Sequence, residues 1–416
     1  MRTYLSSKLM RTVAVGSRHG LVLPPQRATL SQSDVQGITH MGIPSNVISP
    51  WQSAAGGVGR TKRIAELAAI GEGIERAAAA TVAILTRPRQ AIGIEERIDA
   101  DEFCLFSSQQ RDSRGFPFGN VYTDDCPYMQ VFSVQDNMAI WAPQPFVTLQ
   151  DDHATGVPTS SGLAAGPTAE HALLRGIQEL IERDALMTTW LHGLPGKRVK
   201  NNIQHDTEVR QLDGEVFTYD ITPAYSPFSV ALVAGGIKKR GAWRYSLGVA
   251  CRESWDDAAE KAYLEWNQGV LFAGIYGTYT DTSMITDPYA LRSFDEHAMY
   301  YTLHPEEWEG LRLFTKKETV HPTKKRRVFS ADADALAAAR RALKRHGIRM
   351  YYRDITTVDA MQVGVRVVKA LSPDLALIFA HQEWPFLHKV DLLLERNYPG
   401  QNNESVFPYL MPHPLG

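Results

Sequence analysis

Two segments of this chain, residues 72–76 and 179–183, carry the same pattern Glu-x-x-Glu-Arg. Acidic side chains three residues apart on a helix share one face, with Cβ atoms about 5–6 Å apart, and they repel each other. Apolar neighbours such as Ile74 and Ile181 indicate partly buried faces, where carboxylates need cations or hydrogen bonds. The four acids are Glu72, Glu75, Glu179 and Glu182.

A hard divalent cation suits such a set, because hard cations prefer carboxylate oxygens. If the two helices face each other, four carboxylates and the guanidinium groups of Arg76 and Arg183 surround one cleft, a composition typical of a magnesium-bridged triphosphate site. The alternative is an intrahelical salt-bridge patch on each helix. The repetition of the motif in apolar surroundings favours the metal–triphosphate site, and it predicts matching roles for the two segments.

Glycine-rich stretches precede both segments, SAAGGVGR at 53–60 and SSGLAAG at 160–166. We expect loops whose backbone N–H groups approach phosphate oxygens at the helix N-termini. The sequence has no GxxxxGK[ST] string and no GxGxxG after a strand, which argues against a P-loop or Rossmann site. The lack of an HExxH motif argues against a metal hydrolase.

The elements that must position these residues alternate along the chain. Apolar periodicity predicts helices over 60–85, 167–191 with Thr168 as a cap, 256–274, and 330–347 with Ser330 as N-cap. Strands are predicted at 129–134, 228–237, 245–251 and 348–354. This alternation predicts a mixed α/β or α+β fold. We expect residues 1–50 to form an arm or short strands and residues 51–416 to form the main domain, with a proline-rich tail at 408–416.

Composition limits the possible partners and compartment. The 416 residues carry a formal net charge of −2, so no global basic field favours nucleic acid. Three scattered cysteines fit neither a disulfide framework nor a zinc site, and no signal peptide or membrane span is apparent, so a cytoplasmic protein is expected. The basic run Lys324–Arg327 is a solvated loop or a contact for an acidic partner.

The segment SSGLAAGPTAEHALLRGIQELIERDA, at 160–185, resembles the signature of the YcaO-domain family. Segments 68–79, 247–268 and 351–375 are also similar to family segments, so the resemblance covers roughly residues 50–416. It implies a YcaO-type fold that binds ATP and Mg²⁺ between helices, in a site that is neither P-loop nor Rossmann.

The resemblance also implies roles for individual residues. Metal binding is implied for the four glutamates, and phosphate contact is implied for Arg183 and more weakly for Arg76. Glu265 and Gln268, which form a helical Glu-x-x-Gln, are implied to make further ATP contacts. The alternative is that these two residues are the polar rim of an amphipathic helix. Ser161 and Glu170 lie at nucleotide-binding positions of the signature. The sequence departs from the family where Ser161 replaces Asn, Pro167 replaces Asn, His171 replaces a second acid, and Val58 replaces Lys.

YcaO proteins use ATP to activate a backbone amide of a ribosomally made peptide. The proline-rich tail resembles that of azoline-forming members, the D-protein subunits. The resemblance implies that the tail reaches the active site, where His413 would act as acid or base, or the carboxylate of Gly416 would take part. The alternative is a tail that only docks on the protein. The implied partners are a precursor peptide, a separate ThiF-like leader-binding protein and, in some pathways, a flavin-dependent azoline dehydrogenase. The leader-binding protein is expected to be separate because 416 residues leave no room for a fused one. Thioamide or amidine formation, or an idle ATP-binding scaffold, remain alternative functions.

Overall fold

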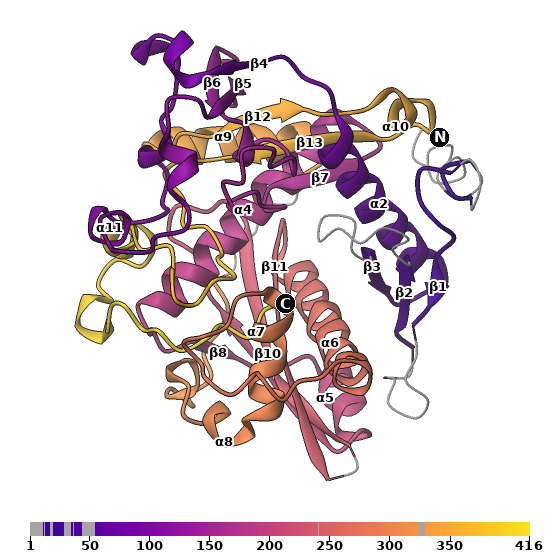
Figure 1. Ribbon diagram of the computed structural model, residues 1–416. Coiled ribbons are helices and arrows are strands. Elements are labelled where there is room, and N and C mark those ends of the chain that lie inside the picture. Colours follow the sequence, from indigo (N-terminus) through magenta and orange to yellow (C-terminus); the bar gives the residue numbers. More distant parts are fainter. Residues whose placement is uncertain are drawn as a thin grey trace. The chain divides into compact units, whose positions relative to one another are not determined.

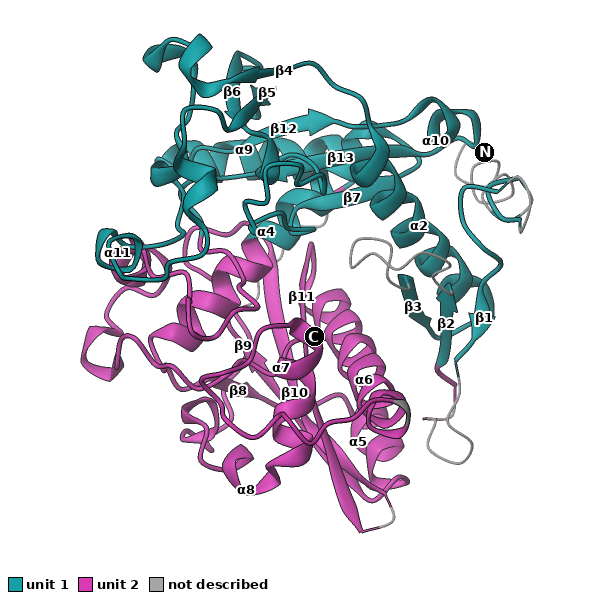
Figure 2. Ribbon diagram, in the orientation of Figure 1, with its two compact units in different colours: residues 1–28, 39–180, 330–375 teal, residues 29–38, 181–329, 376–416 magenta. Residues whose placement is uncertain are grey.

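The structure of the chain is a computed structural model (Figure 1). It describes residues 11, 13–16, 20–28, 35, 37–43, 55–239, 241–323 and 329–416. The basic run at 324–327 and much of the expected N-terminal arm lie outside the described residues. The chain forms two compact units, shown in Figure 2. Unit 1 comprises residues 1–28, 39–180 and 330–375, and unit 2 comprises residues 29–38, 181–329 and 376–416.

Unit 1 contains two sheets in which every pairing between the named strands is antiparallel. The smaller sheet has the order β1 (Gln26–Arg27), β2 (Thr39–Ile43) and β3 (Ala55–Gly59). The larger has the order β4 (Thr86–Pro88), β5 (Pro127–Ser133), β12 (Tyr351–Asp354), β13 (Arg366–Leu371) and β7 (Leu163–Gly166), with β6 (Ala139–Pro143) paired to β5.

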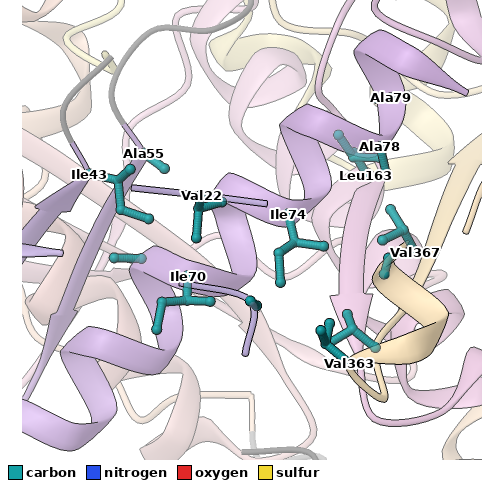
Figure 3. Close-up of a cluster of buried hydrophobic side chains, with 14 of the residues drawn as sticks. Val22, Ile43, Ala55, Ile70, Ile74, Ala78, Ala79, Leu163, Val363 and Val367 are labelled. Atoms are coloured by element: carbon teal, nitrogen blue, oxygen red, sulfur yellow. The ribbon is translucent and has the colours of Figure 1, made fainter. Parts of the chain in front are cut away.

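The first predicted helix is α2 (Lys62–Thr81). Its alanine-rich sequence favours helix, and Thr61 caps its start by accepting the Ile64 N–H at 3.3 Å. Ile70 and Ile74 are buried on the face that packs into a hydrophobic cluster together with side chains of β2, β3, β7 and β13 (Figure 3). Ile64, near the start of the same helix, is exposed. The cluster fixes which face of α2 carries the glutamates.

The glycines before α2 were predicted to lie in a phosphate-binding loop, and this prediction is wrong for residues 55–59, which form β3. A Cβ added at Gly57 would lie 2.2 Å from the Ala65 carbonyl oxygen, and one at Gly59 would lie 2.6 Å from the Ile64 side chain. These glycines therefore allow close packing of strand against helix. The physical reason for the difference is that β2 pairs with this segment along its whole length.

Helix α4 (Ala169–Leu191) begins after Thr168, whose hydroxyl accepts the His171 N–H at 3.1 Å as predicted. It is continuous, with residues up to 180 in unit 1 and the rest in unit 2. Helix α9 (Asp332–Arg345) follows Ala331 as N-cap, so the predicted Ser330 cap is one residue early; the Ser330 hydroxyl bonds the Asp334 carboxylate instead. Unit 1 also contains α3 (Ser108–Arg111) and α10 (Val358–Gln362).

Unit 2 is built on an antiparallel sheet of order β11 (Ala242–Arg252), β10 (Ser229–Lys239), β9 (Gly214–Asp220) and β8 (Lys197–Val199). Helix α6 (Trp255–Tyr279) packs on β10 and β11, where Gly248 allows close approach: a Cβ there would lie 2.1 Å from the Ala262 carbonyl oxygen. The remaining helices are α5 (Ile203–Arg210), α7 (Phe294–Leu303), α8 (Pro305–Trp308) and α11 (Val390–Asn397).

Short 3-10 turns complete the regular structure, at Arg89–Ala91, Ile94–Glu96, Ala100–Glu102, Gly119–Tyr122, Gln144–Phe146, Arg312–Phe314 and Asn402–Glu404. The prediction of a fold that mixes helices and sheets is confirmed. Within the described ranges, no helix combines the length and the apolar character needed to cross a membrane.

Candidate functional site

Glu72 lies on α2 and is held by two partners in unit 1. Its Oε2 accepts the backbone N–H of Gly56 in β3 at 2.8 Å, and its Oε1 accepts the Arg76 guanidinium at 2.7 Å. Glu72 and Arg76 are both partly buried. The predicted intrahelical salt bridge therefore exists, but the carboxylate is also anchored to the strand that precedes the helix.

Glu179, on the unit 1 half of α4, repeats this arrangement. Its Oε2 accepts the backbone N–H of Gly162, just before β7, at 2.9 Å. In both segments the first glutamate of the motif thus binds a glycine N–H in the glycine-rich stretch upstream of its own helix. The backbone amides that were expected to face phosphate instead hold these carboxylates. The matching roles predicted from the sequence echo hold at the level of geometry.

Glu75 joins the two segments. Its Oε1 accepts the backbone N–H of Ala165 in β7 at 2.6 Å, so a carboxylate of α2 is bound by the strand that leads towards α4. The pKa of Glu75 is raised to about 8, mainly by desolvation and also by the charges of Glu72 and Glu179, although the Ala165 hydrogen bond and Arg76 oppose the rise. Three of the four predicted carboxylates therefore lie close enough to interact.

Lys369, in β13, was missed by the sequence reasoning. It is 2% exposed, and its Nζ donates to the carbonyl oxygens of Thr159 and of Ser161, the latter at 2.7 Å. Burial lowers its pKa to about 7, against the charge of Glu179. It supplies a buried ammonium group beside the carboxylates and fixes the turn that presents the Gly162 N–H. A single lysine inside the apolar run VRVVKAL was the available signal.

Glu182 and Arg183 lie one helical turn beyond Glu179, in the part of α4 that belongs to unit 2. Glu182 is buried, and its Oε2 accepts the Cys251 N–H of β11 at 3.0 Å. The Arg183 Nε lies 3.8 Å from Glu182 Oε1. All four glutamates therefore have one oxygen bound by a backbone N–H.

The other predicted nucleotide contacts are spread over both units. Ser161 is buried in unit 1, where its N–H donates to the Thr159 hydroxyl at 3.1 Å. Glu170 is exposed in the first turn of α4. In unit 2, Glu265 and Gln268 are partly buried on α6, and Glu265 pairs with Lys261 at 3.1 Å, as the polar-rim alternative predicts.

The departures from the family pattern have local explanations in two cases. His171 pairs with Asp332 at 3.1 Å and so links the first turns of α4 and α9 in unit 1. Val58 is buried in β3. Pro167 directly precedes the Thr168 cap, and nothing further in the structure explains it.

The tail places His413 in the interior of unit 2, 0% exposed. Its Nε2 donates to the Phe379 carbonyl at 2.7 Å, and its ring stacks on His297 with centroids 4.2 Å apart. The pKa of His413 is lowered well below its usual value, mainly by burial. The charge of His297 and, more weakly, that of Arg183 lower it as well. Gly416 is exposed. The tail histidine therefore lies within electrostatic range of Arg183.

The carboxylates fit a magnesium–nucleotide site. Oxygen donors are what Mg²⁺ prefers, and Glu75 lies close enough to Glu72 and Glu179 for their charges to raise its pKa. Among the described residues, no three carboxylate, imidazole or thiol side chains are arranged to hold an ion by themselves. Magnesium usually binds through one or two carboxylates, several waters and substrate phosphates, so a bound triphosphate would complete the coordination.

Solved structures share this fold at low sequence identity. A heterocyclase in complex with substrate and cofactor matches with a TM-score of 0.79 and 18% identity over 99% of this chain and 57% of that one, so this chain spans little more than half of that protein. YcaO from Methanopyrus kandleri, bound with AMPPCP and Mg²⁺, matches with a TM-score of 0.64 and 15% identity over 89% and 88% of the chains. A chain of the E. coli microcin synthetase McbBCD complex matches with a TM-score of 0.64 and 18% identity, over 94% of this chain and 96% of that one.

The comparison with curated proteins gives no match. The fold is shared with a protein solved with AMPPCP and Mg²⁺ bound, and the sequence carries no P-loop motif. The profile of the YcaO cyclodehydratases, described as ATP- and Mg²⁺-binding, matches residues 56–376, and the chain belongs to this family. ATP and Mg²⁺ are the cofactors of the family, and the resemblance noted in the sequence is confirmed.

Proposed function

We propose that this chain is the ATP-dependent cyclodehydratase subunit that converts Cys, Ser or Thr residues of a ribosomal precursor peptide to thiazoline or oxazoline. The observation that supports it best is the convergence of Glu72, Glu75 and Glu179 in unit 1, each oriented by a backbone N–H. The family supports ATP use, and the azoline product is the finer part of the proposal.

In the proposed reaction, the substrate side chain loses its proton and attacks the carbonyl carbon of the preceding residue, forming a C–S or C–O bond. The resulting oxyanion takes the γ-phosphoryl group, and the bond from that phosphorus to the ADP oxygen breaks. The amide nitrogen then loses its proton, a C=N bond forms, and phosphate leaves. The peptide loses one water, and ATP becomes ADP and phosphate.

The glutamates Glu72, Glu75, Glu179 and Glu182 would hold Mg²⁺, directly or through water. Bound magnesium supplies Lewis-acid stabilisation of the phosphoryl oxygens. Arg183, and more weakly Arg76, would bind phosphate, because guanidinium groups offer paired donors to phosphate oxygens. Further nucleotide contacts are proposed for Ser161, Glu170, Glu265 and Gln268.

The buried His413 is proposed to act through its side chain at the reacting amide. Because its Nε2 donates to the Phe379 carbonyl, the neutral ring offers a lone pair at Nδ1, which has no hydrogen-bond partner among the described residues. A base with this orientation can accept a proton from the substrate. The Gly416 carboxylate is the second proton acceptor that the tail offers.

The proposed partners are a precursor peptide, a ThiF-like leader-binding protein and, for azoles, a flavin-dependent azoline dehydrogenase. The E. coli McbBCD complex, which contains several proteins, has also been solved with pro-MccB17 bound. That relative is therefore found in a complex and with a bound peptide. For this chain, both remain part of the proposal.

The test is peptide-dependent ADP release together with the mass of the peptide. Cyclodehydration removes one water per ring, whereas a thioamide replaces oxygen with sulfur and gains mass. We expect Glu182→Gln to abolish both signals, because the Cys251 N–H can still be accepted but one anionic ligand is lost. Glu66→Gln, on α2 but paired with Arg11 and Lys62, is the matched control. ADP release unchanged in Glu182→Gln would contradict the proposed role of Glu182, and a wild-type protein without peptide-dependent ADP release would favour an idle scaffold.

A further inference from the structure

The C-terminal tail is held in unit 2 by a row of side-chain donors. Four consecutive carbonyl oxygens, those of residues 410–413, each lie within hydrogen-bonding distance of one side-chain nitrogen or hydroxyl oxygen. The distances, in tail order, are 2.7, 2.6, 2.7 and 3.1 Å. We call the four side chains the tail cradle; in the same order their facing atoms are Gln382 Nε2, Trp190 Nε1, Tyr301 Oη and His297 Nδ1. The His297 Nε2 also faces the Ala380 carbonyl at 3.0 Å, so the neutral ring donates to one of its two carbonyl partners.

The tail cradle is assembled from three separate parts of unit 2. Trp190 lies on α4, His297 and Tyr301 lie one turn apart on α7, and Gln382 follows β13 in the chain. None of the four is more than 4% exposed. Donors that are buried and come from distant segments have fixed positions, so together they define one path for the tail.

All four contacts are to backbone carbonyl oxygens of the tail. Tail residues Pro412 and Pro414 have no N–H group, and their rings fix φ, so the segment is a stiff row of acceptors. Rigid aromatic donors facing a stiff proline-containing strand are the chemistry by which polyproline II peptides are recognised. Buried carbonyl oxygens need hydrogen-bond partners, and here side chains from distant segments supply them.

The path ends at His413. Its orientation is fixed by the Phe379 carbonyl and by stacking on His297, which itself belongs to the tail cradle. His297 thus touches the tail twice, through its ring face and through its Nδ1. Any loosening of the tail cradle therefore changes where the His413 imidazole lies relative to Arg183.

We infer that the tail cradle is a positioning device, and that Gln382, Trp190, Tyr301 and His297 are positioning residues for the tail in the reaction. This rests on the proposed function, in which the tail takes part. The ligand of the cradle is the chain's own proline-containing C-terminal segment. None of the four residues is proposed to touch the peptide or the nucleotide.

The experiment compares two adjacent tyrosines of α7 in the full-length chain. Tyr301→Phe removes the donor to the Pro412 carbonyl, whereas Tyr300→Phe removes a hydroxyl that donates to Glu307 at 3.0 Å and does not face the tail. We measure the rate at which carboxypeptidase Y releases tail residues, and peptide-dependent ADP formation at saturating ATP. Circular dichroism checks that both variants are folded.

We expect Tyr301→Phe to speed release about fivefold, the effect of one neutral hydrogen bond, and to lower kcat by a similar factor with the KM for ATP unchanged. Tyr300→Phe should match the wild type in both. Equal release from the two variants would overturn the inference, as would faster release with undiminished kcat. If wild-type protein shows no peptide-dependent turnover, the proposed function fails, while faster release from Tyr301→Phe alone would still support the cradle.

Discussion

Glu75 is a proposed metal ligand whose burial opposes its ionised form. It is partly buried between two other acids, and its pKa is raised to about 8, first by desolvation. The folded state therefore binds its proton more tightly than the unfolded state. The stability that this proton contributes is complete below about pH 4.5 and is lost as pH rises to about 8. Above that pH the Glu75 carboxylate of the metal-free protein is ionised, and its desolvation lowers the stability of the folded state in full.

We predict that Glu75→Gln raises the melting temperature of the metal-free protein, because glutamine cannot ionise but can still accept the Ala165 N–H. The gain over wild type should be small near pH 4.5 and should grow up to about pH 8. The same variant should lose stabilisation by Mg²⁺ and AMPPCP. Scanning calorimetry at several pH values measures both, with Glu66→Gln as control. A gain that is independent of pH would disprove the explanation.

The four glutamates were predictable from the sequence because their helical spacing is local. Their anchors were not. Gly56 and Gly162 lie 16 and 17 residues from the glutamates they hold, and Ala165 lies 90 residues from Glu75. Lys369 reaches back over 200 residues to the turn at Ser161. Such contacts depend on tertiary packing, which no spacing rule encodes.

At the scale of the element, α4 carries both the proposed metal-binding residues and a set of residues that anchor the helix. Asp184 directly follows Arg183 and is 0% exposed. Its carboxylate accepts the Tyr225 hydroxyl at 2.8 Å, the Asn397 amide at 2.8 Å and the Ala376 N–H at 2.7 Å, all in unit 2. Desolvation raises the pKa of Asp184 although Arg396 and these hydrogen bonds oppose it. This network fixes the rotation of the helix and so the direction of Glu182.

We predict that Asp184→Ala destabilises the protein by about 3 kcal/mol, because it leaves several buried donors without an acceptor. Asp184→Asn should cost less, since its amide oxygen still accepts. Urea denaturation followed by circular dichroism measures both. Finding Asp184→Ala as stable as Asp184→Asn would show that the network does not anchor α4.

The four predicted helices and the four predicted strands overlap observed elements because apolar periodicity is strong in them, whereas helices such as α5, α7 and α11 were not predicted. The exceptions were decided by neighbours. The glycines at 55–59 became a strand because β2 pairs with them, and the cap of α9 moved from Ser330 to Ala331 while the serine bonded Asp334. Glycine-rich sequence alone does not distinguish a phosphate loop from a strand that must lie close to a helix.

At the scale of the whole molecule, the chain is divided between two units that each draw on three separate stretches of sequence. The sequence predicted residues 51–416 as the main domain, and nothing in its composition marks the division. α4 contributes residues to both units, so the second motif, 179–183, is shared between them as well. Contacts between distant segments decide such a division.

We predict that Mg²⁺ and AMPPCP together raise the melting temperature of the wild-type protein, and that neither does so fully alone. Because a ligand stabilises only the state that binds it, a free ligand concentration of 100 times Kd should raise the free energy of unfolding by about 2.7 kcal/mol. Adding EDTA should return the melting temperature to the nucleotide-free value. The same shift with AMPPCP in EDTA would exclude a metal-bridged nucleotide.

The paired bonds from Glu72 to Gly56 and from Glu179 to Gly162 have one further consequence. A free glutamate side chain rotates among many conformers, and immobilising it on a metal costs up to about 2 kcal/mol of rotamer entropy. Here folding has already restricted that rotation. Preorganised carboxylates let a weakly held, largely hydrated ion be captured together with its phosphate, with little conformational freedom left to lose.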